Sequence, residues 1–315
     1  MSVSSKKILA VLGPTGSGKS RFAIEIAKKV CGEIISCDSM AVYKGVDIAT
    51  DKIPFTEREE IPHHLYDVAE AGTFFSAGLF RKMALEEIEN ILERKKIPII
   101  VGGTGLYARA LLSGMAEAPS RDDKLREKLK SIADKKGTPH LHAILQKLDK
   151  ERALSITIND KVRIIRAIEL RILTGRKFSE IASLNKYLPE DYQVKKICLY
   201  YPREILYKRI ENRVDQMVQR GLFEEVKALY DSKKLSGPLS KAIGIKEIIP
   251  CLEGNKKFED AVAEIKQHTR NLAKRQLTWF KKEIELKWIV MDDEDERARI
   301  LDEIERWSRG ESYEW

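Results

Sequence analysis

Eight residues near the start of the chain have the composition of a phosphate-binding loop. The run Gly13-Pro14-Thr15-Gly16-Ser17-Gly18-Lys19-Ser20 fits the pattern G-x-x-x-x-G-K-[ST]. Glycines allow backbone N–H groups to surround an anion, and a helix that begins after such a loop adds partial positive charge. In this pattern the Lys19 ammonium reaches a terminal phosphate, and the Ser20 hydroxyl binds Mg²⁺. The loop therefore predicts a site for a phosphorylated ligand and leaves the ligand open.

Two further polar side chains follow apolar segments of the chain. Asp38 comes after the apolar residues of 32–37, and Thr104 lies in a glycine-rich turn, 102–105, that follows the apolar segment 97–101. Ligands of open α/β sheets bind beyond the carboxyl ends of the strands, so Asp38 is expected to face the phosphate pocket. There it could be a general base or a metal ligand, or it could only cap a helix or turn. The turn at Thr104 offers further donors, or is merely a tight strand-to-helix connection.

The elements that must position these residues follow from the spacing of apolar side chains. Strands are predicted at 6–12, 32–39, 97–101, 194–202 and 288–290. Helices are predicted from about residue 22 and at 76–95, 106–112, 203–219, 222–230 and 258–282. This alternation of strands and helices predicts an α/β fold whose core is a parallel sheet like that of the P-loop NTPases.

The middle of the chain differs in composition from both ends. Residues 116–196 are highly charged and helical in pattern, with no further strand–loop–helix signal. We therefore expect an inserted helical domain at 116–196 and a core domain made of 1–115 and 197–315. Arg163 and Arg166 lie three positions apart, on one helix face, where they could bind RNA phosphates or simply face solvent.

The charge of the chain is unevenly distributed. The 315 residues carry a formal net charge of +8, but the last 25 hold ten acidic and four basic side chains, which leaves +14 on residues 1–290. A basic body favours a polyanionic partner such as nucleic acid, although ordinary solvated lysines account for it equally well. Lys266, Arg270 and Lys274 recur at every fourth position, which would form a basic stripe suited to an RNA backbone.

The remaining composition points to a cytoplasmic protein without a membrane partner. The chain has no run of about 18 apolar residues, and its first residues lack an apolar signal region. Its four cysteines form no Cys-x-x-Cys pair, so we expect reduced thiols rather than disulfides or a zinc site.

Six motifs lie along the chain in a fixed order. They are Gly13–Ser20; Asp38-Ser39-Met40 with Tyr43-Lys44-Gly45 and Asp47-Ile48; Pro62-His63-His64-Leu65; Val101–Tyr107; Asn159-Asp160 with Arg163 and Arg166; and Thr269–Trp279. Together they resemble the tRNA dimethylallyltransferases, also called tRNA isopentenyltransferases, over nearly the whole chain. Two departures are Ala41, where the family commonly has Gln, and Ala49, where a glycine is usual. The change at Ala41 affects one expected contact with a base of the tRNA and not the expected reaction.

The resemblance implies an enzyme that transfers a dimethylallyl group from dimethylallyl diphosphate to N6 of the adenosine next to the tRNA anticodon, position 37. It implies that Gly13–Ser20 hold the donor's diphosphate, with Mg²⁺ on Ser20, and that Lys19, Thr104 and Arg213 stabilise the leaving group. Asp38 would orient N6 and accept its proton. The implied tRNA contacts are Asp38, Ser39, Met40, Ala41, Thr104, Arg126, Val162, Arg163, Ile164, Ile165, Arg166, Lys241, Ala242, Ile243, Gly244, Ile245 and Lys246. We expect a monomer.

Three other functions stay open at this level. A P-loop kinase of a small molecule or nucleoside could use the same loop, with Asp38 deprotonating a hydroxyl. A nucleotide-gated RNA-binding protein without chemistry is a second alternative, and prenylation of free adenine nucleotides is a third. The charged insertion and the basic C-terminal helix count against the kinase. Asp38 and Thr104 beside the loop count against the protein without chemistry.

Overall fold

The computed structural model describes residues 6–185, 187–283 and 285–311. The described residues up to Leu112 and from Pro189 onward form one compact unit, and those from Ser113 to Leu188 form another. Residues 189–196 thus belong to the first unit, and the boundary expected at residue 196 falls inside a strand that starts at Tyr192. The expected 194–202 strand begins and ends two residues earlier because its backbone pairs with the first strand from Lys6 onward.

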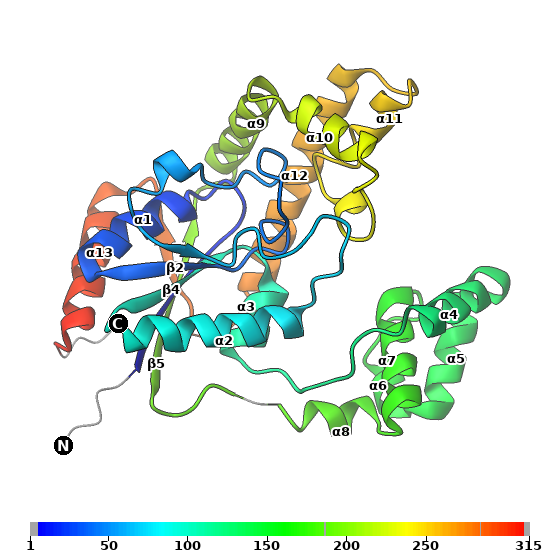
Figure 1. The fold of residues 1–315 in the computed structure, drawn as a ribbon. Helices are drawn as coiled ribbons and strands as arrows, with labels where there is room; N and C mark the ends of the chain where they lie inside the picture. The colour runs from blue at the N-terminus through cyan, green and yellow to red at the C-terminus, as the bar shows by residue number, and fades with distance from the viewer. Residues whose placement is uncertain (1–5, 186, 284, 312–315) are drawn as a thin grey trace. The chain divides into compact units, whose positions relative to one another are not determined.

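The first unit contains a six-stranded sheet with the order β3-β2-β4-β1-β5-β6 (Figure 1). All its neighbouring strands are parallel, which confirms the predicted α/β core. The strands are β1 (Lys6–Leu12), β2 (Gly32–Ser36), β3 (His63–His64), β4 (Ile97–Gly102), β5 (Tyr192–Tyr200) and β6 (Lys287–Val290). The two-residue β3 was not predicted, because so short a strand has no alternating pattern.

Helices connect or follow these strands, and most of them lie close to the predicted positions. They are α1 (Lys19–Val30), α2 (Ala77–Glu93), α3 (Gly105–Leu112), α9 (Arg203–Gln219), α10 (Leu222–Asp231), α11 (Ile249–Leu252), α12 (Phe258–Phe280) and α13 (Glu294–Arg309). Single 3₁₀ turns lie at Phe55–Glu57 and Leu239–Lys241. None of the helices in the described part of the chain has the length and apolar character needed to cross a lipid bilayer.

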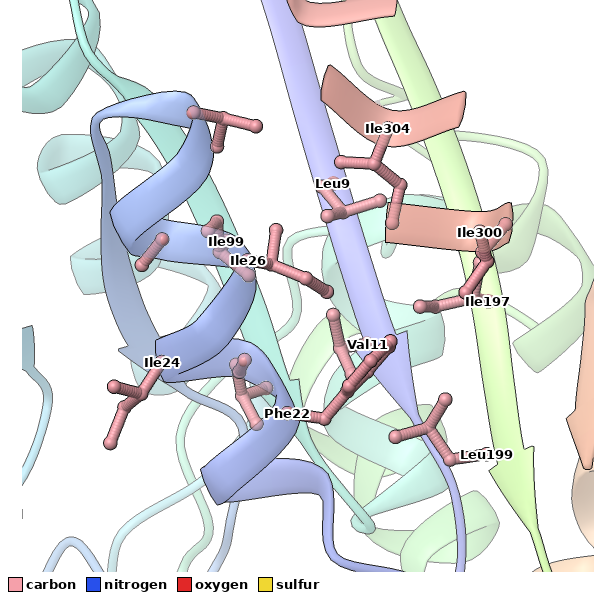
Figure 2. Packing of buried hydrophobic residues seen from close by; sticks show 14 of the residues in the cluster. Leu9, Val11, Phe22, Ile24, Ile26, Ile99, Ile197, Leu199, Ile300 and Ile304 are labelled. Atoms are coloured by element: carbon pink, nitrogen blue, oxygen red, sulfur yellow. The ribbon is translucent and has the colours of Figure 1, made fainter. Parts of the chain in front are cut away.

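The core on one face of the sheet fixes where α1 begins. Leu9 and Val11 of β1 point to this face because side chains alternate along a strand, and they meet Phe22 and Ile26 of α1 (Figure 2). Ile304 of α13 packs into the same cluster. Because these side chains are almost fully buried, α1 cannot slide along β1 without opening cavities. The start of α1 is thereby held at the carboxyl end of β1.

The second unit is built from helices alone in its described residues. These are α4 (Asp123–Lys136), α5 (Thr138–Leu148), α6 (Lys150–Leu154), α7 (Lys161–Thr174) and α8 (Phe178–Ala182). Its core contains Leu141 and Leu145 of α5, which pack with Ile164 and Ile168 of α7. Each of these four side chains is almost completely buried. The unit therefore has its own hydrophobic core, as expected of a domain.

A buried carboxylate ties α4 to α7 within this unit. Glu169 is fully buried and accepts two hydrogen bonds from Arg126, at 2.7 and 2.8 Å, and one from Arg166 at 2.6 Å. The backbone N–H of Asp122 donates a fourth at 2.8 Å. Burial alone would raise the pKa of Glu169, but these bonds outweigh it and lower the pKa to about 2.

We predict that Glu169→Gln destabilises the helical unit at neutral pH. Removing one partner of a buried ion pair costs about 3 to 5 kcal/mol, and the partial exposure of both arginines favours the lower end. Because the pKa of Glu169 is lowered, the wild-type advantage is present above the pKa of an unfolded glutamate and is lost as the pH falls toward about 2.

Hydrogen exchange of the α4 and α7 amides measures this difference in the full-length protein at neutral and at acidic pH. The matched control is Glu127→Gln, which removes an exposed carboxylate from the same helix α4. A loss of protection that is equal for both variants, or that does not shrink toward low pH, contradicts the assigned role.

Candidate active site

The phosphate-binding loop follows β1 and has a backbone that only glycine adopts easily. Gly13 has a φ of 150°, and a Cβ placed on it would lie 2.5 Å from the Leu199 carbonyl oxygen of β5. Gly18, which precedes the first residue of α1, has a φ of 79°. These two positions let the loop turn tightly over the sheet, so that the backbone N–H groups at the start of α1 point into the space above it.

The side chain of Lys19 reaches back to the start of this loop. Its Nζ atom donates a hydrogen bond of 2.8 Å to the Pro14 carbonyl oxygen. Burial and, after it, the neighbouring positive charge of Arg213 lower the pKa of Lys19 to about 8, although the Asp38 carboxylate acts in the opposite direction. No carboxylate of the described residues forms an ion pair with the Lys19 ammonium, so a bound anion would supply that partner and raise its pKa.

A glutamine of α12 joins the phosphate-binding loop to the second glycine-rich turn. Gln276 accepts a hydrogen bond from the Thr15 backbone N–H and donates one to the Gly103 carbonyl oxygen, both at 2.9 Å. A Cβ on Gly103 would lie 2.4 Å from the Gln276 side chain, so the turn needs glycine there. Gln276 was not among the predicted site residues. Its only sequence signal was its place in the motif Thr269–Trp279.

Asp38 lies beyond the end of β2, as predicted, on a loop that is fastened to the end of β4. Its Oδ1 atom accepts hydrogen bonds from the backbone N–H groups of Met40, at 2.8 Å, and Ala41, at 3.3 Å. The Thr104 hydroxyl accepts a bond of 3.0 Å from the Ser39 N–H and donates to the Ser39 hydroxyl. One carboxylate oxygen of Asp38 thus has the turn-forming role given as its alternative. Among the described residues, none donates a hydrogen bond to the other oxygen.

Helix α9 brings arginines to the same place. Arg213 donates to the Thr15 hydroxyl of the phosphate-binding loop, and its Nε atom lies 2.7 Å from Oδ2 of Asp51. Arg220, the residue directly after the end of α9, pairs with Oδ1 of Asp51 at 3.2 Å. Arg209, one turn before Arg213, donates to the Gly16 carbonyl oxygen at 3.0 Å. The predicted leaving-group residue Arg213 therefore lies beside the predicted phosphate-binding loop.

These residues surround a cavity of about 1060 Å³. Its wall includes Lys19, Ser20, Asp38, Ala41, Arg213 and Gln276. Gly13, Pro14 and Ser17 of the phosphate-binding loop do not line the cavity. Ser39, Met40 and Thr104 do not line it either and instead support the wall behind Asp38. The cavity is at the large end of the range for small-molecule sites, so it has room for a diphosphate together with a second reactant.

The predicted segment Lys241–Lys246 packs against the loop that follows Asp38. A Cβ placed on Gly244 would lie 3.7 Å from the Cβ of Ala49, so the two stretches are in contact. Lys241 and Lys246 are exposed, whereas Gly244 and Ile245 are buried and Ala242 and Ile243 are half-buried. Only the two lysines of this segment therefore present a charged side chain to a partner.

Predicted tRNA-contacting residues of the helical unit divide into exposed and buried ones. Val162 is 77% exposed, and the side chain of Arg163 is 70% exposed. Ile164 and Ile165 fill the hydrophobic core of the unit, so only their backbone could contact an RNA, and their expected contact stays a prediction. Arg126 and Arg166 are committed to Glu169, as described above.

Two of the three cations expected to form a basic stripe on α12 are in ion pairs. Lys266 pairs with Asp215 at 2.6 Å, and Arg270 pairs with Glu211, both partners being on α9. Lys274, the third member, is exposed. Residues four positions apart lie on the same face of a helix, and α12 packs against α9. Lys266 and Arg270 are therefore both directed at acidic side chains of α9.

We predict that an anionic ligand binds this site less tightly as the pH rises beyond about 8. Below that pH Lys19 is mainly a cation, and above it the uncharged amine predominates in the free protein. Calorimetric titration with an alkyl diphosphate between about pH 7 and 9.5 measures the effect. Lys19→Arg keeps its charge over this range, so its affinity should change less with pH. Parallel pH profiles for the two proteins would contradict the assignment.

Comparisons with known proteins place the chain in a family. The family model described as IPP transferase matches residues 41–283. The tRNA dimethylallyltransferase of Aquifex aeolicus is 47% identical over 283 residues, which are 88% of this chain and 90% of that protein. That of Finegoldia magna is 39% identical over 307 residues, 96% of this chain and 98% of that protein.

Two solved structures are similar over almost the whole chain. A tRNA isopentenylpyrophosphate transferase from Bacillus halodurans has a TM-score of 0.69 and 38% identity, covering 97% of this chain and 96% of that one. A eukaryotic dimethylallyltransferase described as acting on tRNA has a TM-score of 0.85 and 32% identity, covering 99% of this chain and 81% of that one. Because the family model and these relatives span most of its length, the chain belongs to the family of IPP transferases, the tRNA dimethylallyltransferases.

Proposed function

We propose that this protein transfers the dimethylallyl group of dimethylallyl diphosphate to N6 of adenosine 37, next to the anticodon of a tRNA. The observation that carries the proposal is the shared cavity, in which a phosphate-binding loop and a carboxylate past the end of β2 face the same space. Its family membership supports the same reaction, since relatives named tRNA dimethylallyltransferase match it over about nine-tenths of its length or more.

The donor's diphosphate is assigned to Gly13–Ser20 and Arg213. Backbone N–H groups at the start of α1 offer donors to its oxygens. Lys19 and Arg213 supply positive charge where negative charge grows as the diphosphate leaves, and such preorganised charges are a major source of rate enhancement. The predicted role of Thr104 in stabilising the diphosphate stays a prediction, because its hydroxyl is bonded to Ser39.

Mg²⁺ is the proposed metal, held by the Ser20 hydroxyl and by diphosphate oxygens. Ser20 is exposed to the cavity, with Asp38 on the same wall. The described residues contain no cluster of three or more His, Cys, Asp or Glu side chains that could hold a metal. Mg²⁺ commonly uses few protein ligands together with phosphates and water, so this donor set fits it. When bound, the ion neutralises charge on the leaving diphosphate.

Asp38 is assigned to the acceptor base. The exocyclic amine of adenine is a weak nucleophile because its lone pair is delocalised into the ring. In the proposed reaction N6 bonds to C1 of the donor, the C1–O bond to the diphosphate breaks, and the N6 proton passes to Asp38. The turn bonds to Met40 and Ala41 hold one Asp38 oxygen in place and leave the other for N6. The adenine must leave its stack to enter the cavity.

Binding of tRNA is assigned to the exposed cations of each unit. In the first unit these are Lys241 and Lys246, beside the loop that follows Asp38. In the helical unit they centre on Arg163, with Val162 next to it. Phosphate contacts of this kind would make binding strongly dependent on salt. A monomer and a cytoplasmic location remain predictions.

The reaction class is tested by offering the two possible donors. We expect label to enter unmodified tRNA from labelled dimethylallyl diphosphate in the presence of Mg²⁺, and no label to enter from γ-labelled ATP. The alternative, a P-loop kinase, predicts the reverse: phosphate transfer from ATP to a small acceptor and no prenyl transfer. Lys19→Ala serves as the control protein in both assays, because both reactions need the phosphate-binding loop.

A second prediction concerns Asp38. We expect Asp38→Asn to lower the single-turnover rate constant by about 10² to 10⁴, the usual contribution of a general base, because the amide keeps the shape but not the basicity. Affinity for dimethylallyl diphosphate should change little. Asp67→Asn is a matched control, since Asp67 is a carboxylate that pairs with Lys52 rather than a wall residue of the cavity. A near wild-type rate for Asp38→Asn would leave Asp38 only its role in the turn.

A further inference from the structure

The loop between Asp38 and α2 carries a carboxylate that the proposed reaction does not use. Asp51 has a φ of 48°, in the left-handed region that residues with side chains rarely adopt. It lines the same cavity as Lys19 and Asp38. Its two oxygens lie 2.7 Å from Nε of Arg213 and 3.2 Å from Nη1 of Arg220. Both arginines therefore share Asp51 as an acidic partner.

The backbone on either side of Asp51 is held firmly. The Glu225 carboxylate of α10 accepts three hydrogen bonds of 2.8 Å from the backbone N–H groups of residues 47–49. On the other side, the buried Lys52 ammonium donates to the Tyr43 carbonyl oxygen at 2.6 Å and pairs with Asp47 and Asp67. Because both neighbouring segments are fastened to the first unit, the Asp51 side chain is directed at α9 by a rigid stretch of backbone.

Arg213 is consequently held between two fixed groups. One of its Nη atoms donates to the Thr15 hydroxyl in the phosphate-binding loop, and its Nε atom lies 2.7 Å from Oδ2 of Asp51 in an ion pair without hydrogen-bond geometry, so charge attraction is what holds this side of the guanidinium. A guanidinium that is held at both ends keeps one orientation, whereas a long side chain with a single contact samples several. The carboxylate also offsets part of the positive charge that Lys19, Arg213 and Arg220 bring to the cavity.

We propose that Asp51 is a positioning residue that aims Arg213 at the donor's diphosphate and keeps the cavity from retaining the diphosphate after transfer. This inference deepens the proposed function and rests on it. Removing the Asp51 charge is thus expected to lower the transfer rate but to raise the affinity for diphosphate. Loss of the Asp51 charge misaligns Arg213 and slows transfer, while the unpaired arginines attract the released diphosphate more strongly. A residue that only supported the loop would weaken both transfer and binding.

The test compares full-length Asp51→Asn with wild type in two measurements, both with Mg²⁺. Calorimetric titration with inorganic diphosphate should show roughly two- to fivefold tighter binding, the range expected for a partly exposed ion pair. The single-turnover rate of dimethylallyl transfer should fall by roughly ten- to a hundredfold, as for other small losses of orientation. Circular dichroism checks that the variant is folded.

Two matched variants separate charge from loop structure. Asp51→Glu restores the charge and should return diphosphate affinity to the wild-type value. Glu225→Gln loosens the same loop without removing the carboxylate beside Arg213, so it should slow transfer without tighter diphosphate binding. Unchanged or weaker binding of diphosphate by Asp51→Asn, or an unchanged transfer rate, overturns the inference. If wild type binds diphosphate but transfers no prenyl group, the proposed function fails, and the affinity comparison still decides the charge role of Asp51.

Discussion

The packing of α1 against β1 is the constraint on which the rest of the site depends. Leu9 and Val11 are buried against Phe22 and Ile26, and these contacts fix the helix along the strand. Every such side chain removes apolar surface from water, and together they outweigh the cost of the tight glycine turn between the two elements. The first backbone N–H groups of α1 and the ammonium of Lys19 are thereby placed at one edge of the sheet. A helix that could slide by one residue would turn them away from the cavity.

Parallel strand order then brings separate stretches of sequence to that edge. Because β2, β4, β1 and β5 are neighbours and run in the same direction, the segments that follow them meet above their carboxyl ends. This is why Asp38, Gly103 and the phosphate-binding loop border one cavity although up to about 90 residues separate them. Gln276, from a helix near the C-terminus, links two of these segments by hydrogen bonds to Thr15 and Gly103. The site is thus assembled by sheet topology and held by a few side-chain bonds.

Electrostatics inside the first unit are balanced rather than simply positive. The cavity gathers Lys19, Arg213 and Arg220, but Asp38 and Asp51 lie on the same wall. In the helical unit, likewise, Arg126 and Arg166 neutralise a buried glutamate. Basic residues of this chain therefore serve two purposes: some hold the fold together through ion pairs, and others stay exposed for a polyanion. Net charge alone cannot distinguish them, because it records neither burial nor partners.

Local spacing and the order of motifs along the chain were enough to predict a phosphate-binding loop, the α/β class, the position of Asp38 after β2 and the family. Which side chains are exposed and unpaired depends instead on how distant elements pack. Ile164 and Ile165 turned out to be core residues, and Lys266 and Arg270 are paired with α9. The bridge through Gln276 and the pairing of Asp51 with two arginines were likewise decided by the fold. All of these contacts join residues more than 50 positions apart, and only the packing of distant elements brings them within bonding distance.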